Sequence, residues 1–221
     1  MPRYRTRSWR AFDPAALPAR TAAPTAATAT ARSSAVTRLP PARIVRVLGI
    51  DPGSQRTGYG VIECGGAESK PLVHGCIAVG SSGSLNERLR RIFEGIGELI
   101  ERYRPDEIAI EKVFVNRNVD SALKLGHARG AALCAVPIAT PVFEYTPRAV
   151  KLAVVGFGGA EKTQVAHMIR AMLTLEGKLS VDASDALAVA VCHAHTRRMH
   201  ALTSSAGVTV AIGGAAAGRA R

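Results

Sequence analysis

The stretch from residue 44 to residue 64 reads IVRVLGIDPGSQRTGYGVIEC, two apolar segments on either side of a turn that contains Pro and Gly. Apolar, β-branched segments separated by such a turn predict paired strands, here at 44–51 and 57–64. A third apolar segment, LVHGCIAV at 72–79, follows after a short loop. Together the three segments predict an antiparallel meander.

The rest of the ordered chain alternates helical and strand-like patterns. A helix is predicted by apolar residues at helical spacing, which are Leu85, Leu89, Ile92, Ile96, Leu99 and Ile100. EIAIEKVF at 107–114 and PVFEYT at 141–146 predict strands, and further helices are predicted at 118–135, 160–174 and 181–196. The pattern indicates an α/β fold, with a mixed five-stranded sheet (an antiparallel three-strand meander plus two parallel strands) flanked by helices.

The net charge of +12 is concentrated at the two ends of the chain. Residues 1–43 hold eight Arg and one Asp, and residues 197–221 hold four Arg and no acid. The segment 44–196 holds seventeen Lys and Arg against sixteen Asp and Glu. Composition predicts a disordered basic extension at 1–43, a folded domain at 44–196 and a disordered tail at 197–221. Basic tails are common, so this charge is only a weak indication of nucleic-acid binding.

Two further observations concern the environment of the protein. No apolar run is long enough to span a bilayer. The four cysteines show no CxxC spacing and sit in apolar stretches, which predicts buried, reduced thiols and a cytoplasmic location. The Arg-rich, acid-poor residues 1–43 also resemble an organelle transit peptide, although a dispensable extension or an early start codon accounts for them better.

Two acids stand at strand ends. Asp51 closes the first strand and is followed by a turn, at the edge where an α/β sheet forms its functional crevice. Glu111 follows the apolar residues 108–110 at the end of the other central strand, where a buried carboxylate is costly unless it is paired or bound to metal. Taken singly, Asp51 is equally well explained as a turn-forming residue, and Glu111 is better explained as a surface residue just past its strand.

Two more acids lie near the start of the last helix. Asp182 and Asp185 are three residues apart, which places them on one helical face, although an N-cap and its N3 partner have the same spacing. Four converging carboxylates repel one another and require cations between them. Oxygen ligands suit Mg²⁺ or Mn²⁺, and two such ions can promote phosphodiester hydrolysis. The four acids together therefore predict a metal-dependent nuclease.

At these residues the chain resembles the RuvC family of Holliday-junction resolvases, which have the RNase H-like fold. The matching stretches are LGIDPGSQRTGYGVIE, IAIEKVFVNRNVDSALKLGHARG, VFEYTPRAVKLAVVGFGGAEKTQV and DASDALAVAVCH, in family order over residues 45–196. The resemblance implies that Asp51, Glu111, Asp182 and Asp185 are catalytic and bind two Mg²⁺ ions. It implies a homodimer that resolves four-way junction DNA by paired symmetric nicks, leaving 5′-phosphate and 3′-hydroxyl ends. The implied partners are RuvA and the RuvB branch-migration motor.

The resemblance also points to residues that contact DNA. Lys151 and Lys162 match family positions, as does Phe114, an aromatic that the family places against junction bases. The lysines lie on either side of GFGGA (156–160), a Gly-rich loop suited to close approach of phosphates. Solvated lysines and a packing Phe are the alternatives. Further candidates for phosphate contacts are Arg117, Arg129 and Arg148.

Three alternatives concern assembly and function. Ala122, Gly126 and Gly130 form a small-residue stripe on the helix at 118–135, which predicts close packing either on a partner's helix or on the chain's own sheet. His193 and His195 point apart on a helix and are not a metal pair.

The G-I-D-x-G motif also occurs in actin-like phosphotransferases, but these need a longer chain and a second Gly-rich phosphate turn. A non-catalytic junction-binding protein would have no reason to keep four clustered carboxylates.

Overall fold

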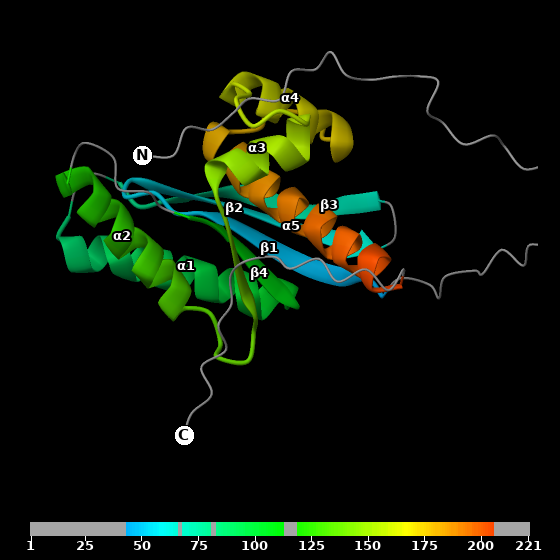
Figure 1. Ribbon diagram of the computed structural model, residues 1–221. Coiled ribbons are helices and arrows are strands. Elements are labelled where there is room, and N and C mark those ends of the chain that lie inside the picture. Colours follow the sequence, from blue (N-terminus) through cyan, green and yellow to red (C-terminus); the bar gives the residue numbers. More distant parts are fainter. Residues whose placement is uncertain (1–42, 66–67, 81–82, 113–118, 206–221) are drawn as a thin grey trace, which may run out of the picture. The chain divides into compact units, whose positions relative to one another are not determined.

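The computed structural model describes residues 43–65, 68–80, 83–112 and 119–205, which all belong to one compact unit (Figure 1). Residues 1–42 and 206–221 lie outside this description. So do residues 113–118, which include Phe114 and Arg117. The predictions made for these two residues and for the basic extension are therefore carried forward as predictions.

The predicted sheet is confirmed. Three antiparallel strands, β1 (Val45–Asp51), β2 (Arg56–Gly65) and β3 (Glu68–Ala78), are joined by β4 (Glu107–Glu111) and β5 (Val142–Tyr145). The strand order is β3-β2-β1-β4-β5, with β4 parallel to β1 and β5 parallel to β4.

Strand β1 is buried on both of its faces, as a central strand must be. Val45 and Val47 lie in one hydrophobic core, and Leu48 and Ile50 lie in a second core on the other side of the sheet. This alternation follows from the period of two in a strand.

Five helices cover the two faces of the sheet: α1 (Leu85–Tyr103), α2 (Val119–Cys134), α3 (Pro147–Val155), α4 (Lys162–Met172) and α5 (Val181–Ser205). Helices α1 and α2 pack on one face, and α5 crosses the other beneath α3 and α4 (Figure 1). In the part of the chain described, no helix is long and apolar enough to cross a membrane.

Two helices differ from the sequence-based prediction. Helix α3 was not predicted, although its ends carry clear signals. The Thr146 hydroxyl accepts a hydrogen bond from the Ala149 N–H at 3.1 Å, Pro147 occupies the first turn, and Gly156 ends the helix with φ 81°. Helix α5 continues to Ser205, so the tail predicted at 197–221 is wrong for 197–205. No Gly or Pro interrupts these residues, and the helix therefore continues.

The four cysteines are free thiols, as predicted. Cys64 and Cys192 are buried and Cys76 is half-buried. Cys134 is exposed, contrary to the prediction of burial, because it is the last residue of α2 and lies outside the helix's contact with the core.

Candidate active site

Two of the predicted acids end neighbouring parallel strands. Asp51 is the last residue of β1 and Glu111 is the last residue of β4. Ile50 of β1 is paired with Ile110 of β4. Asp51 and Glu111 each follow one residue later, so they lie side by side at the ends of these two parallel strands. Ala109 lies in the core on the α5 side, and alternate residues of a strand share a face. Glu111 therefore faces α5.

The other two acids lie on the first turns of α5, and neither caps the helix. The capping side chain is Ser180, whose hydroxyl accepts a hydrogen bond from the Ala183 N–H at 3.3 Å. The alternative interpretation of Asp182 as an N-cap is therefore wrong. Its Oδ2 instead lies 3.8 Å from Cys76 Sγ and 4.0 Å from an Arg56 guanidinium nitrogen. Sequence reasoning missed both neighbours, because β3 and β2 reach Asp182 only through the sheet register.

Helix α5 approaches the sheet so closely because the strands beneath it carry glycine. A Cβ atom added at Gly58, which is paired with Asp51, would lie 2.0 Å from the Asp182 carbonyl oxygen. A Cβ atom at Gly49 would lie 2.1 Å from the Ala186 carbonyl oxygen. Both distances are far below contact distance, so only glycine fits. The helix backbone thus rests directly on β1 and β2, which brings its acids over Asp51.

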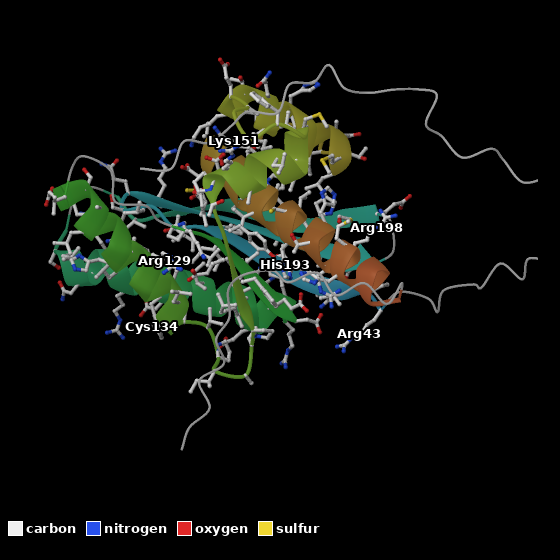
Figure 2. All side chains as sticks on the ribbon, viewed as in Figure 1. Arg43, Arg129, Cys134, Lys151, His193 and Arg198 are labelled. Atoms are coloured by element: carbon white, nitrogen blue, oxygen red, sulfur yellow. The ribbon has the colours of Figure 1, made fainter. Side chains whose placement is uncertain are left out.

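Both predicted lysines are brought to the acids. Lys162, the first residue of α4, donates a hydrogen bond from Nζ to Asp185 Oδ2 at 2.7 Å. Lys151 lies on α3 and is half-buried (Figure 2). Burial raises the pKa of Glu111, and the positive charges of Lys162 and Lys151 partly offset that rise, which places both lysines near the carboxylate. Lys162 is at once solvated, with its side chain 72% exposed, and paired with Asp185.

The carboxylates carry charge that is poorly compensated. Burial raises the pKa of Asp51 from its ordinary value near 3.8 to about 7, and the charges of Glu111 and Asp185 add to the effect. Burial also raises the pKa of Glu111, with a further contribution from Asp185. The hydrogen bond to Asp185 raises the pKa of Lys162. Mutual perturbation of this kind shows that these side chains share one site, and such shifts are typical of functional sites.

The donor set suits a hard divalent cation. All donor atoms of the four acids are carboxylate oxygens, and a cation would relieve the repulsion that raises the pKa of Asp51. As the side chains stand, no three His, Cys, Asp or Glu residues within the described ranges form a metal-binding cluster. The Lys162 ammonium is the cation that contacts Asp185 in this arrangement.

Comparison with known proteins agrees with this geometry. The family model described as crossover junction endodeoxyribonuclease RuvC matches residues 47–193. The chain belongs to the RuvC family. The match includes all four acids and both lysines.

Curated and solved members of the RuvC family cover the same residues. The crossover junction endodeoxyribonuclease RuvC of Xanthomonas axonopodis pv. citri (strain 306) is 56% identical over 156 residues, 70% of this chain and 90% of the relative. The Thermus thermophilus RuvC structure is 37% identical, with TM-score 0.65, over 70% of this chain and 96% of that one. A structure of T. thermophilus RuvC in complex with Holliday junction substrate has TM-score 0.67 at 37% identity and covers 71% and 96%. The RNase H-like fold expected from the sequence is thereby confirmed.

The Gly-rich loop after α3 was predicted to suit close approach of phosphates to its backbone, and the contact of its glycines with DNA stays a prediction. The structure shows what lies on the side of two of them where a Cβ atom would stand. A Cβ atom at Gly158 would lie 2.8 Å from Arg148 Cγ, and one at Gly159 would lie 2.7 Å from Phe157 Cζ. The space beside the two glycines is therefore filled by side chains of the chain itself.

Two of the arginines predicted to contact phosphates, Arg129 and Arg148, lie among the described residues. Their surroundings differ. Arg129 forms an ion pair with Glu144 and its side chain is 20% exposed, so its charge is already matched. Arg148 is exposed on α3 beside Gly158. Of the two, Arg148 is the better placed to meet a phosphate.

His193 (Figure 2) is part of the contact between α5 and the sheet, where it meets residues of β4 and β5. Its Nδ1 is 2.6 Å from the Tyr145 hydroxyl, and its Nε2 is 2.6 Å from Glu107 Oε2. Burial lowers the pKa of His193. His195 Nδ1 is 3.1 Å from the Ala153 carbonyl oxygen on α3, so the two histidines face different elements, as predicted.

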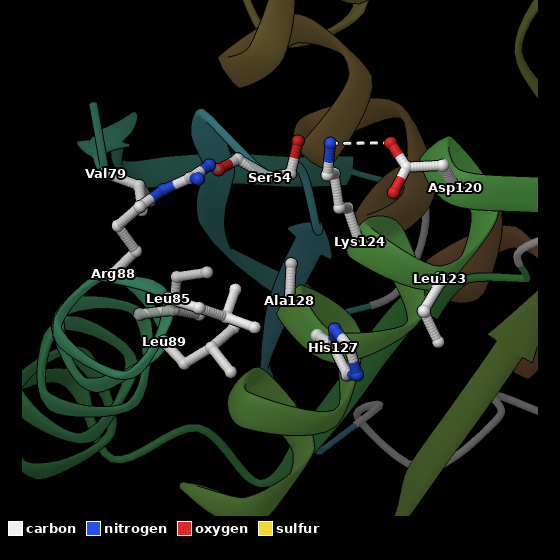
Figure 3. Close-up of a pocket in the computed structure, with 11 residues that line it drawn as sticks. Ser54, Val79, Leu85, Arg88, Leu89, Asp120, Leu123, Lys124, His127 and Ala128 are labelled. Atoms are coloured by element: carbon white, nitrogen blue, oxygen red, sulfur yellow. Dashed lines mark hydrogen bonds and ion pairs between the residues drawn. The ribbon is translucent and has the colours of Figure 1, made fainter. Parts of the chain in front are cut away.

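Figure 3 shows a pocket of about 230 Å³ on the α1–α2 side of the sheet, the face opposite the acids. Arg88 lines it and donates a hydrogen bond to the carbonyl oxygen of Ser54, three residues after Asp51. Lys124 and Asp120 form an ion pair of 2.6 Å at its rim. The pocket thus contributes to the site indirectly, because Arg88 connects the loop after Asp51 to α1.

The small-residue stripe on α2 is turned away from the chain's own core. Cβ atoms added at Gly126 and Gly130 would meet nothing within 4 Å. The buried residues of α2 are Ala128 and Ala132, on another side of the helix. Packing of the stripe on the chain's own sheet is therefore excluded.

Proposed function

We propose that this protein is a structure-selective DNA endonuclease that resolves four-way (Holliday) junctions in recombination and repair by paired, symmetric nicks. The observation that carries the proposal is the convergence of strand-end and helix acids on one face of the sheet, in a chain of the RuvC family. A cytoplasmic location is proposed with it.

The four acids Asp51, Glu111, Asp182 and Asp185 are proposed to hold two Mg²⁺ ions, which Mn²⁺ can replace. When bound, such ions activate water and stabilise the charge that develops on the leaving oxygen. The carboxylates favour cations because they are buried and repel one another. With a pKa near 7, Asp51 carries a proton in part of the molecules at neutral pH, and this proton leaves when a cation arrives.

The lysines are proposed to position the phosphate that is cut. An ammonium group has three donors, so Lys162 can contact Asp185 and a phosphate oxygen at the same time. This would align the phosphorus with the acids. The water oxygen then bonds to phosphorus while the bond from phosphorus to the 3′-oxygen breaks. The 3′-oxygen takes up a proton, which leaves 3′-hydroxyl and 5′-phosphate ends.

A homodimer is proposed to form through α2. Ala122, Gly126 and Gly130 offer a face on which the helix of a second copy can pack closely, and nothing in the described chain covers it at the two glycines. Two copies related by a two-fold axis would present two sites to strands of like polarity. RuvA and RuvB are proposed as partners on the strength of the family, with Phe114 meeting junction bases and Arg117 a phosphate.

The decisive experiment is cleavage of a synthetic four-way junction and a linear duplex of matching sequence, each with and without Mg²⁺. We expect nicks only in the junction and only with Mg²⁺, with ends that a ligase seals. Asp185→Asn should bind the junction without cutting it. Binding without cleavage by the wild type would instead indicate a junction-binding protein, and ATP turnover without DNA cleavage would indicate a phosphotransferase.

A further inference from the structure

Phe157 lies in the turn between α3 and α4 with 66% of its surface exposed. A single exposed apolar residue is ordinary on a protein surface. What distinguishes Phe157 is that its ring lies against Gly159, in the turn that leads into α4, whose first residue Lys162 contacts Asp185.

The backbone holds the ring in place. Gly156 ends α3 with φ 81°, and the Ala160 N–H donates to the Phe157 carbonyl oxygen at 3.2 Å, which closes the turn. A Cβ atom at Gly159 would lie 2.7 Å from Cζ and 2.9 Å from Cε1 of the ring. The ring therefore lies directly against Gly159, which leaves the rest of its surface to solvent.

Two cationic side chains belong to the surroundings of this turn. The stem of Arg148 crosses Gly158 in the same turn. Lys162 begins the next helix, with its Nζ 2.7 Å from Asp185. The acid in this segment, Glu161, is the N-cap of α4, and its N–H donates a hydrogen bond to Gln164 Oε1 at 2.8 Å. Aromatic rings between basic groups are the usual means of holding single-stranded nucleic acid, because phosphates meet the cations while bases stack on the rings.

We propose that Phe157 is a stacking platform for an unpaired nucleobase, next to the phosphate that is cut. This inference rests on the proposed function. Its ligand is any of the four bases, because every base presents a π face, so the contact favours unpaired DNA over paired DNA without reading sequence. The contact holds the strand against Arg148 and Lys162 and thereby orients the phosphate at the acids.

The test is an abasic scan of a junction around its crossover, with binding measured in EDTA so that no cutting occurs. Wild type should lose about 5- to 100-fold in affinity when one particular base is removed. Phe157→Ala should bind the intact junction more weakly by a similar factor and should be insensitive to removal of that base. Phe157→Leu, which keeps an apolar side chain without an aromatic face, should behave like Phe157→Ala. Leu72→Ala is a control at an exposed apolar residue of β3. It should lose affinity on removal of that base by the same factor as the wild type.

A second readout does not depend on affinity. The single tryptophan of the chain is Trp9, so Phe157→Trp in a Trp9→Phe background provides one fluorophore at the platform. Intact junction should quench its emission, and junction lacking the identified base should not. The salt dependence of binding by Phe157→Ala should match that of wild type, because stacking releases no counterion.

The results distinguish failure of the stacking platform from failure of the proposed function. If wild type binds and cuts junctions but Phe157→Ala shows the same abasic profile, or Phe157→Trp is not quenched, Phe157 is not a platform and the proposed function stands. If wild type shows no preference for the junction, the proposed function fails and the platform fails with it.

Discussion

Substitution of Gly58 by Ala tests whether the backbone contact between α5 and β2 sets the spacing of the acids. A Cβ atom there would lie 2.0 Å from the Asp182 carbonyl oxygen, whereas carbon and oxygen atoms rarely come within about 3 Å of each other. The first turn of α5 or the strand must therefore move by about 1 Å. A misplacement of that size can lower a rate about 100-fold, and overpacking of this kind costs about 1–3 kcal/mol of stability.

The assay measures junction cleavage in single turnover together with thermal unfolding. Gly58→Ala should cut about 100-fold more slowly and melt a few degrees lower, since each kcal/mol shifts the Tm of a chain this size by roughly 2–4 °C. Gly97→Ala is the matched control, because a Cβ atom at Gly97 on α1 meets nothing within 4 Å. It should cut normally and gain stability. Cleavage by folded Gly58→Ala at the wild-type rate would refute the argument that this contact sets the spacing.

Four further outcomes are expected. Asp51→Asn should abolish cleavage. The pKa of Asp51 is about 7 when folded and near 3.8 when unfolded, so in EDTA the wild-type free energy of unfolding should fall between pH 4 and 7 as the unfolded chain loses its proton first. Urea unfolding at pH 5 and pH 8 should show a smaller fall in the variant. Lys162→Ala should weaken junction binding and reduce the salt slope by about one, as measured by titration at several salt concentrations. Gly126→Leu should give a folded monomer by sedimentation, and a persisting dimer would place the interface elsewhere. Deletion of residues 1–43 should leave junction cutting intact while duplex binding weakens in a filter assay.

The strands and the acids were predictable because their signals are local. Each acid closes a buried strand or opens an apolar helix, and those patterns are visible in a few consecutive residues. The predicted elements differ from the observed ones mainly at their ends, as frayed termini lead one to expect. Helix α3 was overlooked even though Thr146, Pro147 and Gly156 are standard signals of a helix start and stop.

Contacts that depend on register or on three-dimensional packing were out of reach. Cys76 approaches Asp182 because β3 pairs with β2 in one particular register, and no short-range pattern specifies it. The glycines at 158 and 159 indicate close approach, but the sequence does not say to what. Only the fold shows that Arg148 and Phe157 take that space.

The glycine-lined contact beneath α5 also bears on how the site behaves as temperature rises. Side chains exchange rotamers within picoseconds to nanoseconds, so a gap held by side chains widens and narrows continually. Beneath the start of α5 the helix meets the sheet through the carbonyl oxygens of Asp182 and Ala186, and no rotamer can change that spacing. The distance between the backbones that carry the helix acids and the strand acids can change only if the start of α5 or the strands beneath it move. The acids should therefore hold their arrangement up to the temperature at which the whole domain unfolds, with cleavage and folded structure lost over the same interval.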